Sequence, residues 1–269
     1  MRHVENGLLS EIRNKLGYLD RHLSPEMILK ERKIFQSKIL KSAQYQSFKI
    51  EHPNLGTSYS IPRNDKKNSI RIGIQNIESA FKWGKNYFQM NGLDENLLRG
   101  ISGRILPDIY PGNTAFFRSS GTRIVGARTT PPDPYKIREV EIPLFLDSLN
   151  RKLKDPDKIA QMMAAFYAHL HLVRIHPFVD GNGRTSRALQ DIILDHNIIP
   201  LPIIDAGERY TYFDALDEAV YDWKHLRHSG EITHGSTAGE KNFYTFMAGK
   251  VNSSLDKVIC LMGKGSSEF

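Results

Sequence analysis

Apolar residues recur at helical spacing in the N-terminal part of the chain. Leucine and isoleucine return every three or four positions between residues 8 and 23, which predicts an amphipathic helix there. Ser24 followed by proline is a start signal, with an N-cap residue before the first helical position. It predicts a second helix that reaches about Glu51. This helix should end there because the next residue precedes Pro53, and a residue before proline disfavours the α region.

The rest of the chain repeats the helical pattern after a polar connection over residues 53–68. Apolar positions at helical spacing, together with the turn residues between them, predict further helices. These are expected over residues 74–91, 93–106, 135–152, 156–175, 183–193, 209–223 and 241–259. The chain should therefore be mostly α, with its helices packed as a bundle around one core.

One segment departs from the helical pattern. Between residues 116 and 127, Thr122, Ile124 and Val125 alternate near glycines, and two prolines follow at 131 and 132. Alternation bounded by turn residues is typical of strands. A small β-hairpin is expected here.

The composition fits one large domain, or a domain with an appendage. With 269 residues and 40% hydrophobic content, the chain can bury a full core. The soft boundaries in the pattern suggest three parts. We expect an N-terminal helical region over residues 1–65, a core over 66–228, and a C-terminal helix and tail over 229–269.

Cysteine usage and hydropathy bear on the compartment. Cys260 is the single cysteine, so no internal disulfide can form, which suits a reducing environment. No apolar run of about 18 residues occurs, and the first residues lack a signal-peptide core. We therefore expect a cytoplasmic protein without a membrane segment.

The net charge of +7 and the pI near 9.3 suit an acidic partner or a nucleotide, and they also suit mere solubility. No dense basic run is interleaved with aromatic residues. Nucleic acid is therefore not an expected partner.

The candidate chemistry is concentrated in residues 176–187, which read His-Pro-Phe-Val-Asp-Gly-Asn-Gly-Arg-Thr-Ser-Arg. Because Pro177 disfavours the α region for His176, the preceding helix should stop there and leave the imidazole at its end. An unperturbed histidine, with a pKa of about 6.5, can take a proton from a hydroxyl near neutral pH. His176 is thus a candidate general base.

The remainder of this segment has the features of a phosphate site. Gly181 and Gly183 allow a tight turn that bares backbone N–H groups, and the following helix adds its own free amides. Arg184 and Arg187 would share a face of its first turn, where cations oppose the helix dipole by up to ~1 kcal/mol each. Such a cost suggests that an anion completes the site. Asp180, beside phosphate oxygens, is a candidate Mg²⁺ ligand, and together these groups favour phosphoryl or nucleotidyl transfer.

Residues 176–187 resemble the signature of the Fic family, His-x-Phe-x-Asp/Glu-Gly-Asn-Gly-Arg-x-x-Arg, and match it at every defined position. The resemblance implies a mostly α Fic fold, in which a helical bundle core carries a small β-hairpin flap. It also implies transfer of AMP from ATP to a hydroxyl of a target protein, with Mg²⁺ as cofactor. The sequence leaves open the identity of that protein and whether the chain forms a homo-oligomer.

The resemblance assigns a role to each matching residue. His176 would be the general base and Asp180 the metal ligand. The nucleotide-binding residues would be Gly181, Asn182 and Gly183 around the α-phosphate, Arg184 and Arg187 at the β- and γ-phosphates, and Phe178 as the core anchor beneath the loop.

Ser47 and Glu51 resemble the inhibitory helix of some Fic proteins, Ser/Thr-x-x-x-Glu-Gly/Asn, although His52 departs from that pattern. A carboxylate on Arg187 would occupy donors meant for the γ-phosphate, so ATP could bind only in a non-productive pose. The structural alternative is an exposed glutamate on a helix. A rival match at residues 236–240 ranks behind, because a glycine just before its glutamate weakens a helix.

The segment from Arg118 resembles the start of the Fic flap. In the family this hairpin pairs with the backbone of the target around the modified residue, which the resemblance implies for Thr122, Ile124, Val125 and Gly126. Strand addition of this kind gives affinity with little side-chain selectivity. The alternative is a surface hairpin with no ligand.

Other interpretations remain beside the first. His169 and His171 could join His176 in a metal cluster, but spacings of two and five do not share a helix face, so we assign them a structural role. The same site could instead remove AMP, with Glu51 aligning water, or transfer another phosphate-linked group. A third possibility is a non-enzymatic module that senses nucleotide and docks partners.

Overall fold

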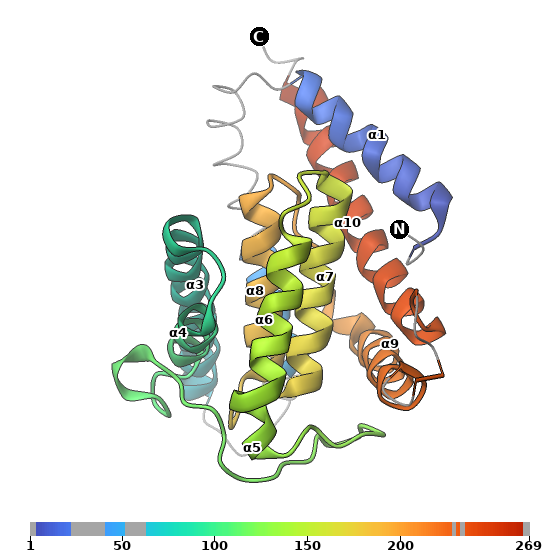
Figure 1. Cartoon of the computed structure of the whole chain (residues 1–269). Coiled ribbons are helices and arrows are strands. Elements are labelled where there is room, and N and C mark those ends of the chain that lie inside the picture. The colour runs from blue at the N-terminus through green and yellow to red at the C-terminus, as the bar shows by residue number, and fades with distance from the viewer. Residues whose placement is uncertain (1–3, 23–40, 52–62, 228–229, 232–234, 266–269) are drawn as a thin grey trace.

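The described part of the chain is all-α (Figure 1). The computed structural model describes residues 4–22, 41–51, 63–227, 230–231 and 235–265. Its α-helices are α1 (Asn6–His22), α3 (Arg63–Asn91), α4 (Glu95–Ile105), α5 (Pro134–Lys136), α6 (Ile142–Lys152), α7 (Lys158–Ile175), α8 (Asn182–His196), α9 (Arg209–Asp222) and α10 (Ala238–Gly265). Residues 41–51 are also helical. Within these ranges no helix combines the length and apolar character that a bilayer crossing needs.

Helices α7 and α8 pack against each other at the centre of the molecule (Figure 1). Helices α3 and α4 pack on α8, and α6 packs on α7. Helices α9 and α10 pack together on the other side, and α1 lies along α10. The short connection between α7 and α8 therefore sits at one end of the bundle, where the long loop between α4 and α5 also runs (Figure 1).

Burial on nearly every face makes α7 the core helix. Phe166 and Leu170 are buried on one side of the helix, and Ala164 and Ala168 are buried on the opposite side. A helix that is apolar all round belongs in a core. The helix is buried all round because α6, α8, α9 and α10 all contact α7.

Helix ends follow the expected capping chemistry. Gly92 ends α3 with a φ of 75° and donates its N–H to the Phe88 carbonyl at 2.9 Å, as a glycine at a helix C-terminus commonly does. The Asp94 side chain caps α4 by accepting from Leu97 N at 2.8 Å. Asp157 caps α7 in the same way. These caps fix where the helices that lead to the site begin and end.

Three boundaries bear on the sequence prediction. Helix α3 begins at Arg63, so the polar connection expected over 53–68 is wrong from residue 63 onward, because arginine and lysine are compatible with a helix. Of the helix expected to reach Glu51, residues 41–51 are helical, and residues 24–40 lie outside the described part. Helix α10 starts earlier than expected because Thr237 and Glu240 form a reciprocal cap, Glu240 N to Thr237 Oγ1 at 3.1 Å and Thr237 N to Glu240 Oε2 at 2.9 Å.

The expected β-hairpin is not formed in this structure. No described residue belongs to a β-strand, and residues 114–133 form an irregular loop. A single turn occurs at Gly126, where φ is 83° and Ala127 N bonds the Ile124 carbonyl at 3.1 Å. Two short strands without a third are marginal on their own, and here the backbone bonds of the loop go elsewhere, as at Arg118 below.

Candidate active site

His176 closes α7 in the left-handed conformation, with φ 50° and ψ 56°. Its backbone N–H still bonds the Leu172 carbonyl at 3.0 Å. A non-glycine residue in this conformation costs roughly 1–2 kcal/mol. The helix ends here because Pro177 follows, as the sequence predicts, and the imidazole is left at the helix end.

Burial is the main influence on the His176 imidazole. The pKa of His176 is lowered to about 4, chiefly by burial and, among nearby charges, by the positive charge of Arg118. The ring is therefore neutral at pH 7. A neutral imidazole is what a general base must present to a hydroxyl.

Arg118 holds the His176 loop in place from the α4–α5 connection. Its Nε donates to the His176 carbonyl at 2.8 Å, and its backbone N–H donates to the Pro177 carbonyl at 2.9 Å. Two further donors bond the carbonyls of Ser120 and Pro132. Arg118 is only 4% exposed, so its four hydrogen bonds are shielded from water. Sequence reasoning did not single out this role, because nothing local marks an arginine whose partners lie far along the chain.

Asn182 braces the loop from within. Its Oδ1 accepts from Phe178 N at 2.9 Å, and its Nδ2 donates to the Phe178 carbonyl at 2.9 Å. Phe178 is fully buried and lies 5.7 Å from the Phe117 ring, centroid to centroid. The side chain of Asn182 is thus used inside the loop, and its backbone opens α8.

The first two turns of α8 contain Gly183 and the buried cations Arg184 and Arg187. Gly181 precedes it with a φ of 75°, and a Cβ there would press on Leu106. The side chain of Arg184 is 8% exposed and lies 3.5 Å from the carboxylate of Asp180, which is 61% exposed. Burial lowers the pKa of Arg184. Cations buried at a helix N-terminus oppose its dipole, so negative charge near this turn is electrostatically favourable.

Glu51 and Ser47 reach this turn from the helix over residues 41–51. Glu51 Oε1 lies 2.6 Å from Arg187 Nη2, and Ser47 Oγ accepts from Arg187 Nε at 2.8 Å. The side chain of Arg187 is 5% exposed. The same Glu51 carboxylate lies against Gly183, so closely that a Cβ there would collide with it. An acidic side chain thus occupies the place where the sequence predicts a phosphate.

Tyr212 and His169 complete the surroundings of Arg187. The Tyr212 hydroxyl accepts from Arg187 Nη1 at 3.2 Å and lies 2.8 Å from His169 Nε2. Both side chains are fully buried. No local pattern in the sequence marks this polar contact of Tyr212.

A family comparison matches residues 92–194 to the Fic/DOC family. This segment of the chain is similar to Fic/DOC-family domains. Protein adenylyltransferase Fic of Nematostella vectensis is 35% identical over 119 residues, which is 44% of this chain and 27% of that protein. Its counterpart in Aedes aegypti is 36% identical over 119 residues, 44% of this chain and 23% of that protein. The matched part spans about a quarter of the length of these relatives.

Solved structures that contain Fic domains share the fold of this chain well beyond the matched segment. A Fic domain-containing signalling protein from Bacteroides thetaiotaomicron superposes with a TM-score of 0.66 at 19% identity, over 94% of each chain. Fic-1 from C. elegans gives a TM-score of 0.66 at 17% identity, over 96% of this chain and 73% of that one. IbpAFic2, covalently tethered to Cdc42, gives 0.55 at 14% identity, over 92% and 70%. The helical Fic fold expected from residues 176–187 is thereby confirmed, although the described residues 116–127 do not form the β-hairpin flap that was expected beside it.

The predicted flap residues lie in the irregular loop of the Fic domain. Val125 is fully exposed, Gly126 is exposed, and Thr122 and Ile124 are partly buried. Arg128 ties the end of this loop to α9, since its N and Nε donate to the two carboxylate oxygens of Asp217 at 2.9 and 2.6 Å. The loop therefore has fixed ends and an exposed middle.

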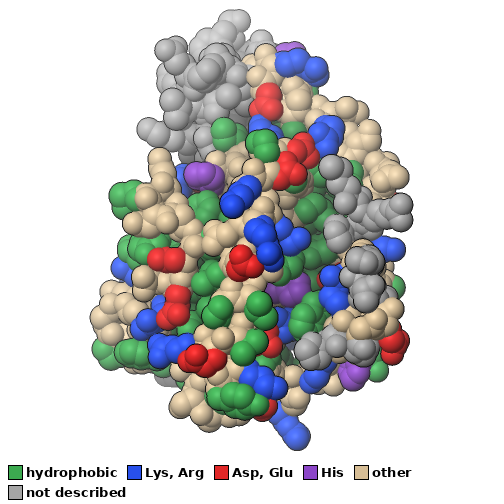
Figure 2. All heavy atoms as spheres, viewed as in Figure 1, with side chains coloured by type: hydrophobic (Ala, Val, Ile, Leu, Met, Phe, Trp, Pro, Cys, Tyr) green, Lys and Arg blue, Asp and Glu red, His purple; other side chains and the backbone are tan. Residues whose placement is uncertain are grey.

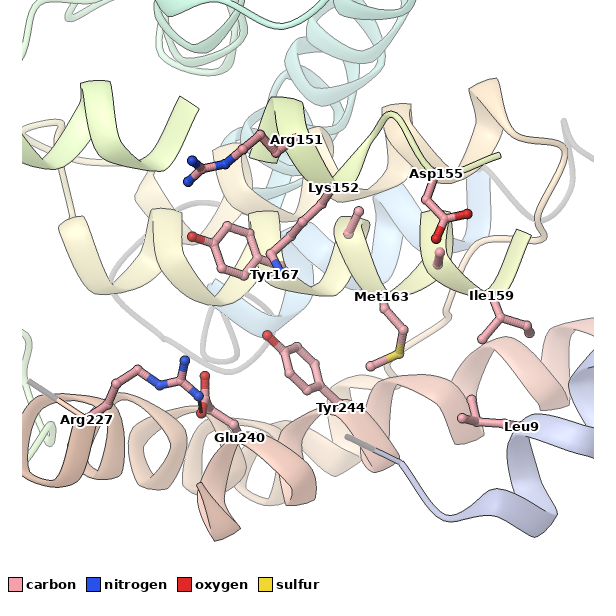
Figure 3. A pocket seen from close by; sticks show the side chains of 12 residues that line it. Leu9, Arg151, Lys152, Asp155, Ile159, Met163, Tyr167, Arg227, Glu240 and Tyr244 are labelled. Carbon is pink, nitrogen blue, oxygen red and sulfur yellow. Dashed lines mark hydrogen bonds and ion pairs between the residues drawn. The ribbon is translucent and has the colours of Figure 1, made fainter. Parts of the chain in front are cut away.

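The rival inhibitory match has another use in the structure. Glu240 is 3% exposed and accepts from Thr237 N in the α10 cap, and Arg227 Nη2 lies 3.0 Å from its carboxylate. It also lines a cavity of about 340 Å³ between the α6–α7 pair and α10, where Lys152, Tyr167 and Tyr244 approach from both sides (Figure 3). No residue of 176–187 lines this cavity.

On the face that Figure 2 shows, acidic and basic side chains of the described residues are interspersed rather than gathered into one patch of a single sign. A phosphate backbone is bound by clustered basic side chains along a face. This face therefore offers no support for a nucleic-acid partner.

Proposed function

We propose that the chain is a Fic-type protein adenylyltransferase that moves AMP from Mg-ATP to a Ser, Thr or Tyr hydroxyl of a target protein. His176 takes the hydroxyl proton as the hydroxyl oxygen attacks the α-phosphorus. The bond from the α-phosphorus to the bridging oxygen of the β-phosphate breaks, and pyrophosphate leaves. The products are the AMP–protein phosphodiester, pyrophosphate and the proton on His176.

One observation carries the proposal: a neutral imidazole and two buried guanidinium groups flank the same short loop. His176 ends α7, and Arg184 and Arg187 lie in the first two turns of α8. General base catalysis contributes roughly 10²–10⁴-fold, and stabilisation of phosphate charge is usually the larger effect. The relatives that match the domain in sequence are named protein adenylyltransferase Fic, which supports the same chemistry.

The residues present fit a nucleotide and a magnesium ion. Gly183 leaves room for an anion at the α8 N-terminus, since a carboxylate already fits there. In this proposal Gly181, Asn182 and Gly183 would line the α-phosphate. Asp180, whose carboxylate is largely exposed, would hold Mg²⁺. Bound Mg²⁺ would supply positive charge that neutralises phosphate oxygens.

Glu51 is the proposed inhibitory residue, with Ser47 as its support. Together they use the Nε and Nη2 donors of Arg187, which the γ-phosphate would otherwise engage. A carboxylate held by a buried guanidinium competes well because charge-assisted hydrogen bonds are strong. Residues 1–65 would then be regulatory and residues 66–228 catalytic.

The irregular loop of residues 118–127 is the proposed docking segment for the target. Its middle around Val125 and Gly126 is exposed. Backbone groups there could pair with an extended peptide of the target, so that loop and peptide form a two-stranded sheet. IbpAFic2, which shares the fold, has been solved with adenylylated Cdc42. A protein target of unknown identity is therefore proposed for this chain as well.

Incubation of the Glu51→Gly protein with Mg²⁺ and ATP labelled on the α-phosphate tests the proposal. Covalent label on protein supports AMP transfer. Label that reaches protein only from the γ-phosphate indicates a kinase instead, and tight ATP binding with no transfer indicates a nucleotide-sensing module. Absence of both ATP binding and transfer would reject a nucleotide site altogether.

Removal of AMP is a second candidate reaction at the same site. It is favoured by the position of the Glu51 carboxylate against Gly183, where it could orient a water toward a bound phosphodiester. Wild-type protein incubated with its own labelled, AMP-modified Glu51→Gly form should then release labelled AMP, and Glu51→Gln should not.

A further inference from the structure

Among the described contacts of Arg187, one hydrogen-bond acceptor lies outside the inhibitory helix. Its Nε and Nη2 donate to Ser47 and Glu51. Its Nη1 donates instead to the Tyr212 hydroxyl at 3.2 Å, and Tyr212 belongs to α9. When Glu51 moves away, as the proposed function requires for productive ATP binding, the contact to Tyr212 can remain.

Tyr212 is itself held by a buried chain of hydrogen bonds. Its hydroxyl oxygen lies 2.8 Å from His169 Nε2, and His169 Nδ1 lies 2.8 Å from Gln190 Oε1. The side chain of Gln190 then donates to Asp191 Oδ1 at 3.2 Å. Tyr212, His169 and Gln190 are at most 1% exposed. The chain therefore links α9, α7 and α8 behind the arginine.

The donors in this chain fix its direction. The Tyr212 oxygen accepts from Arg187, so the single hydroxyl proton goes to His169 Nε2. That nitrogen is then unprotonated, and we assign the ring proton to Nδ1, where Gln190 Oε1 accepts it. Burial lowers the pKa of His169 to about 3, which keeps the ring neutral as this assignment needs.

We propose that Tyr212 and His169 are positioning residues that orient the Arg187 guanidinium toward the terminal phosphates of ATP. The inference rests on the proposed function. A guanidinium on a flexible stem loses its orientation when its partners leave, whereas recognition of phosphate by its planar fork needs a fixed orientation. Tyr212 supplies that restraint from the core, independently of the helix that carries Glu51.

The first test needs no nucleotide. In a background with both Ser47→Ala and Glu51→Gly, which lacks the two side-chain acceptors on the inhibitory helix, NMR of the Arg187 guanidinium should show restricted rotation, seen as separate Nη signals. The assignment is made from an Arg187→Lys sample. Adding Tyr212→Phe removes only the hydroxyl, and the Nη signals should merge. Tyr87→Phe removes a hydroxyl that bonds Asp94 at 2.8 Å next to α3 and should leave the signals separate. Separate signals in the Tyr212→Phe protein would overturn the proposal.

The second test uses the same proteins and compares ATP with AMP by calorimetry. Tyr212→Phe should weaken ATP binding about tenfold, equivalent to ~1.4 kcal/mol, and AMP binding less than about twofold, since AMP lacks the phosphates that Arg187 would contact. Equal losses for both nucleotides, or none, contradict the role.

His169→Leu separates the second residue from the first. His169→Leu removes the acceptor of the Tyr212 hydroxyl. We expect a loss of ATP affinity that is smaller than that of Tyr212→Phe and again selective for ATP over AMP. The melting temperature of the His169→Leu protein should match that of the Tyr87→Phe control. If the His169→Leu protein binds both nucleotides as tightly as the background without this substitution, His169 has no positioning role. If the background protein binds neither nucleotide but the Nη signals merge on Tyr212→Phe, the proposed nucleotide function is wrong. The positioning of Arg187 by Tyr212 is then still supported.

Discussion

The carboxylate of Glu51 lies against Gly183, and a single carbon added to that glycine would collide with it. Gly183 belongs to the first turn of α8, and the same carboxylate is paired with Arg187 at 2.6 Å. The acidic side chain and the proposed phosphate site therefore share one small space. Glu51 and a phosphate cannot both occupy it, so the proposed inhibition would be a direct competition for this space.

Replacing Glu51 by glycine should raise transfer of AMP label to protein by at least about tenfold, the effect of removing ~1.4 kcal/mol of competing interaction. The reason is that Arg187 Nη2 loses its bond to the carboxylate and the space beside Gly183 opens at the same time, although Nη2 still donates to the Ser47 carbonyl. Lys49→Gly is the matched control, because it loses the same ~1 kcal/mol of helix propensity on the same helix. Equal labelling in both variants would mean that a loosened helix, and not the carboxylate, explains any gain.

Gly183→Ala should reverse that gain. In the Glu51→Gly background the new Cβ no longer meets Glu51, but it still fills the place where an anion would approach the α8 N-terminus. Transfer and ATP affinity should both fall by about tenfold or more, which corresponds to losing ~1.4 kcal/mol. Gly207→Ala, where a Cβ meets nothing within 4 Å, is the control. If the Glu51→Gly, Gly183→Ala protein were as active as the Glu51→Gly protein, the phosphate would not bind in the space that Glu51 occupies.

The pH profile of transfer should report His176. Its pKa is lowered to about 4, chiefly by burial, so the base is already deprotonated at pH 6, and kcat/KM of Glu51→Gly should be flat between about pH 5.5 and 8. An ascending limb centred near 6.5 contradicts the buried imidazole as the base. His176→Ala should lower transfer by roughly 10²–10⁴-fold while ATP binding measured by calorimetry is retained.

Arg118 should matter for catalysis through the loop it holds. Arg118→Lys keeps the charge but cannot reproduce hydrogen bonds to the carbonyls of His176, Ser120 and Pro132. Unmet buried carbonyls cost ~1–3 kcal/mol each, so the melting temperature should fall and transfer should fall further. Arg128→Lys in the same loop changes a half-exposed ion pair with Asp217, worth under ~1 kcal/mol, and should have little effect. Comparable losses in the two variants would argue against a special role for Arg118.

The helices and the loop over 176–187 could be predicted because their signals are local. Helical spacing marks α7, Pro177 marks its end, and glycines mark the turn into α8. The bonds from Arg118 to His176 and from Arg187 to Tyr212 join residues 58 and 25 positions apart. No local pattern reports the partner of a buried polar side chain, so only the fold reveals those bonds. The prediction of a β-hairpin was not confirmed for a related reason, since alternation of side chains does not reveal whether a strand has a partner to pair with.

Asp191 offers a test of burial at the rear of the site that does not depend on catalysis. It is 8% exposed, and its pKa is raised to about 7, chiefly by burial. The unfolded chain releases the Asp191 proton near its ordinary pKa of 3.8, whereas the folded state keeps this proton up to about pH 7. Since the folded state binds more protons in this window, its free energy of unfolding should fall as pH rises from 4 to 7 and stay low above pH 7.

Asp191→Asn removes this titration, so its stability relative to wild type should improve from pH 5 to pH 8 by on the order of 1–3 kcal/mol. Urea unfolding of both proteins at pH 5, 6, 7 and 8 measures the difference, and other titrating groups cancel in it. Asp155→Asn at an exposed position of the α6–α7 connection serves as the control. A difference between Asp191→Asn and wild type that stays constant across this range would mean that Asp191 is ionised throughout, and that Gln190 and Arg187 outweigh the effect of burial.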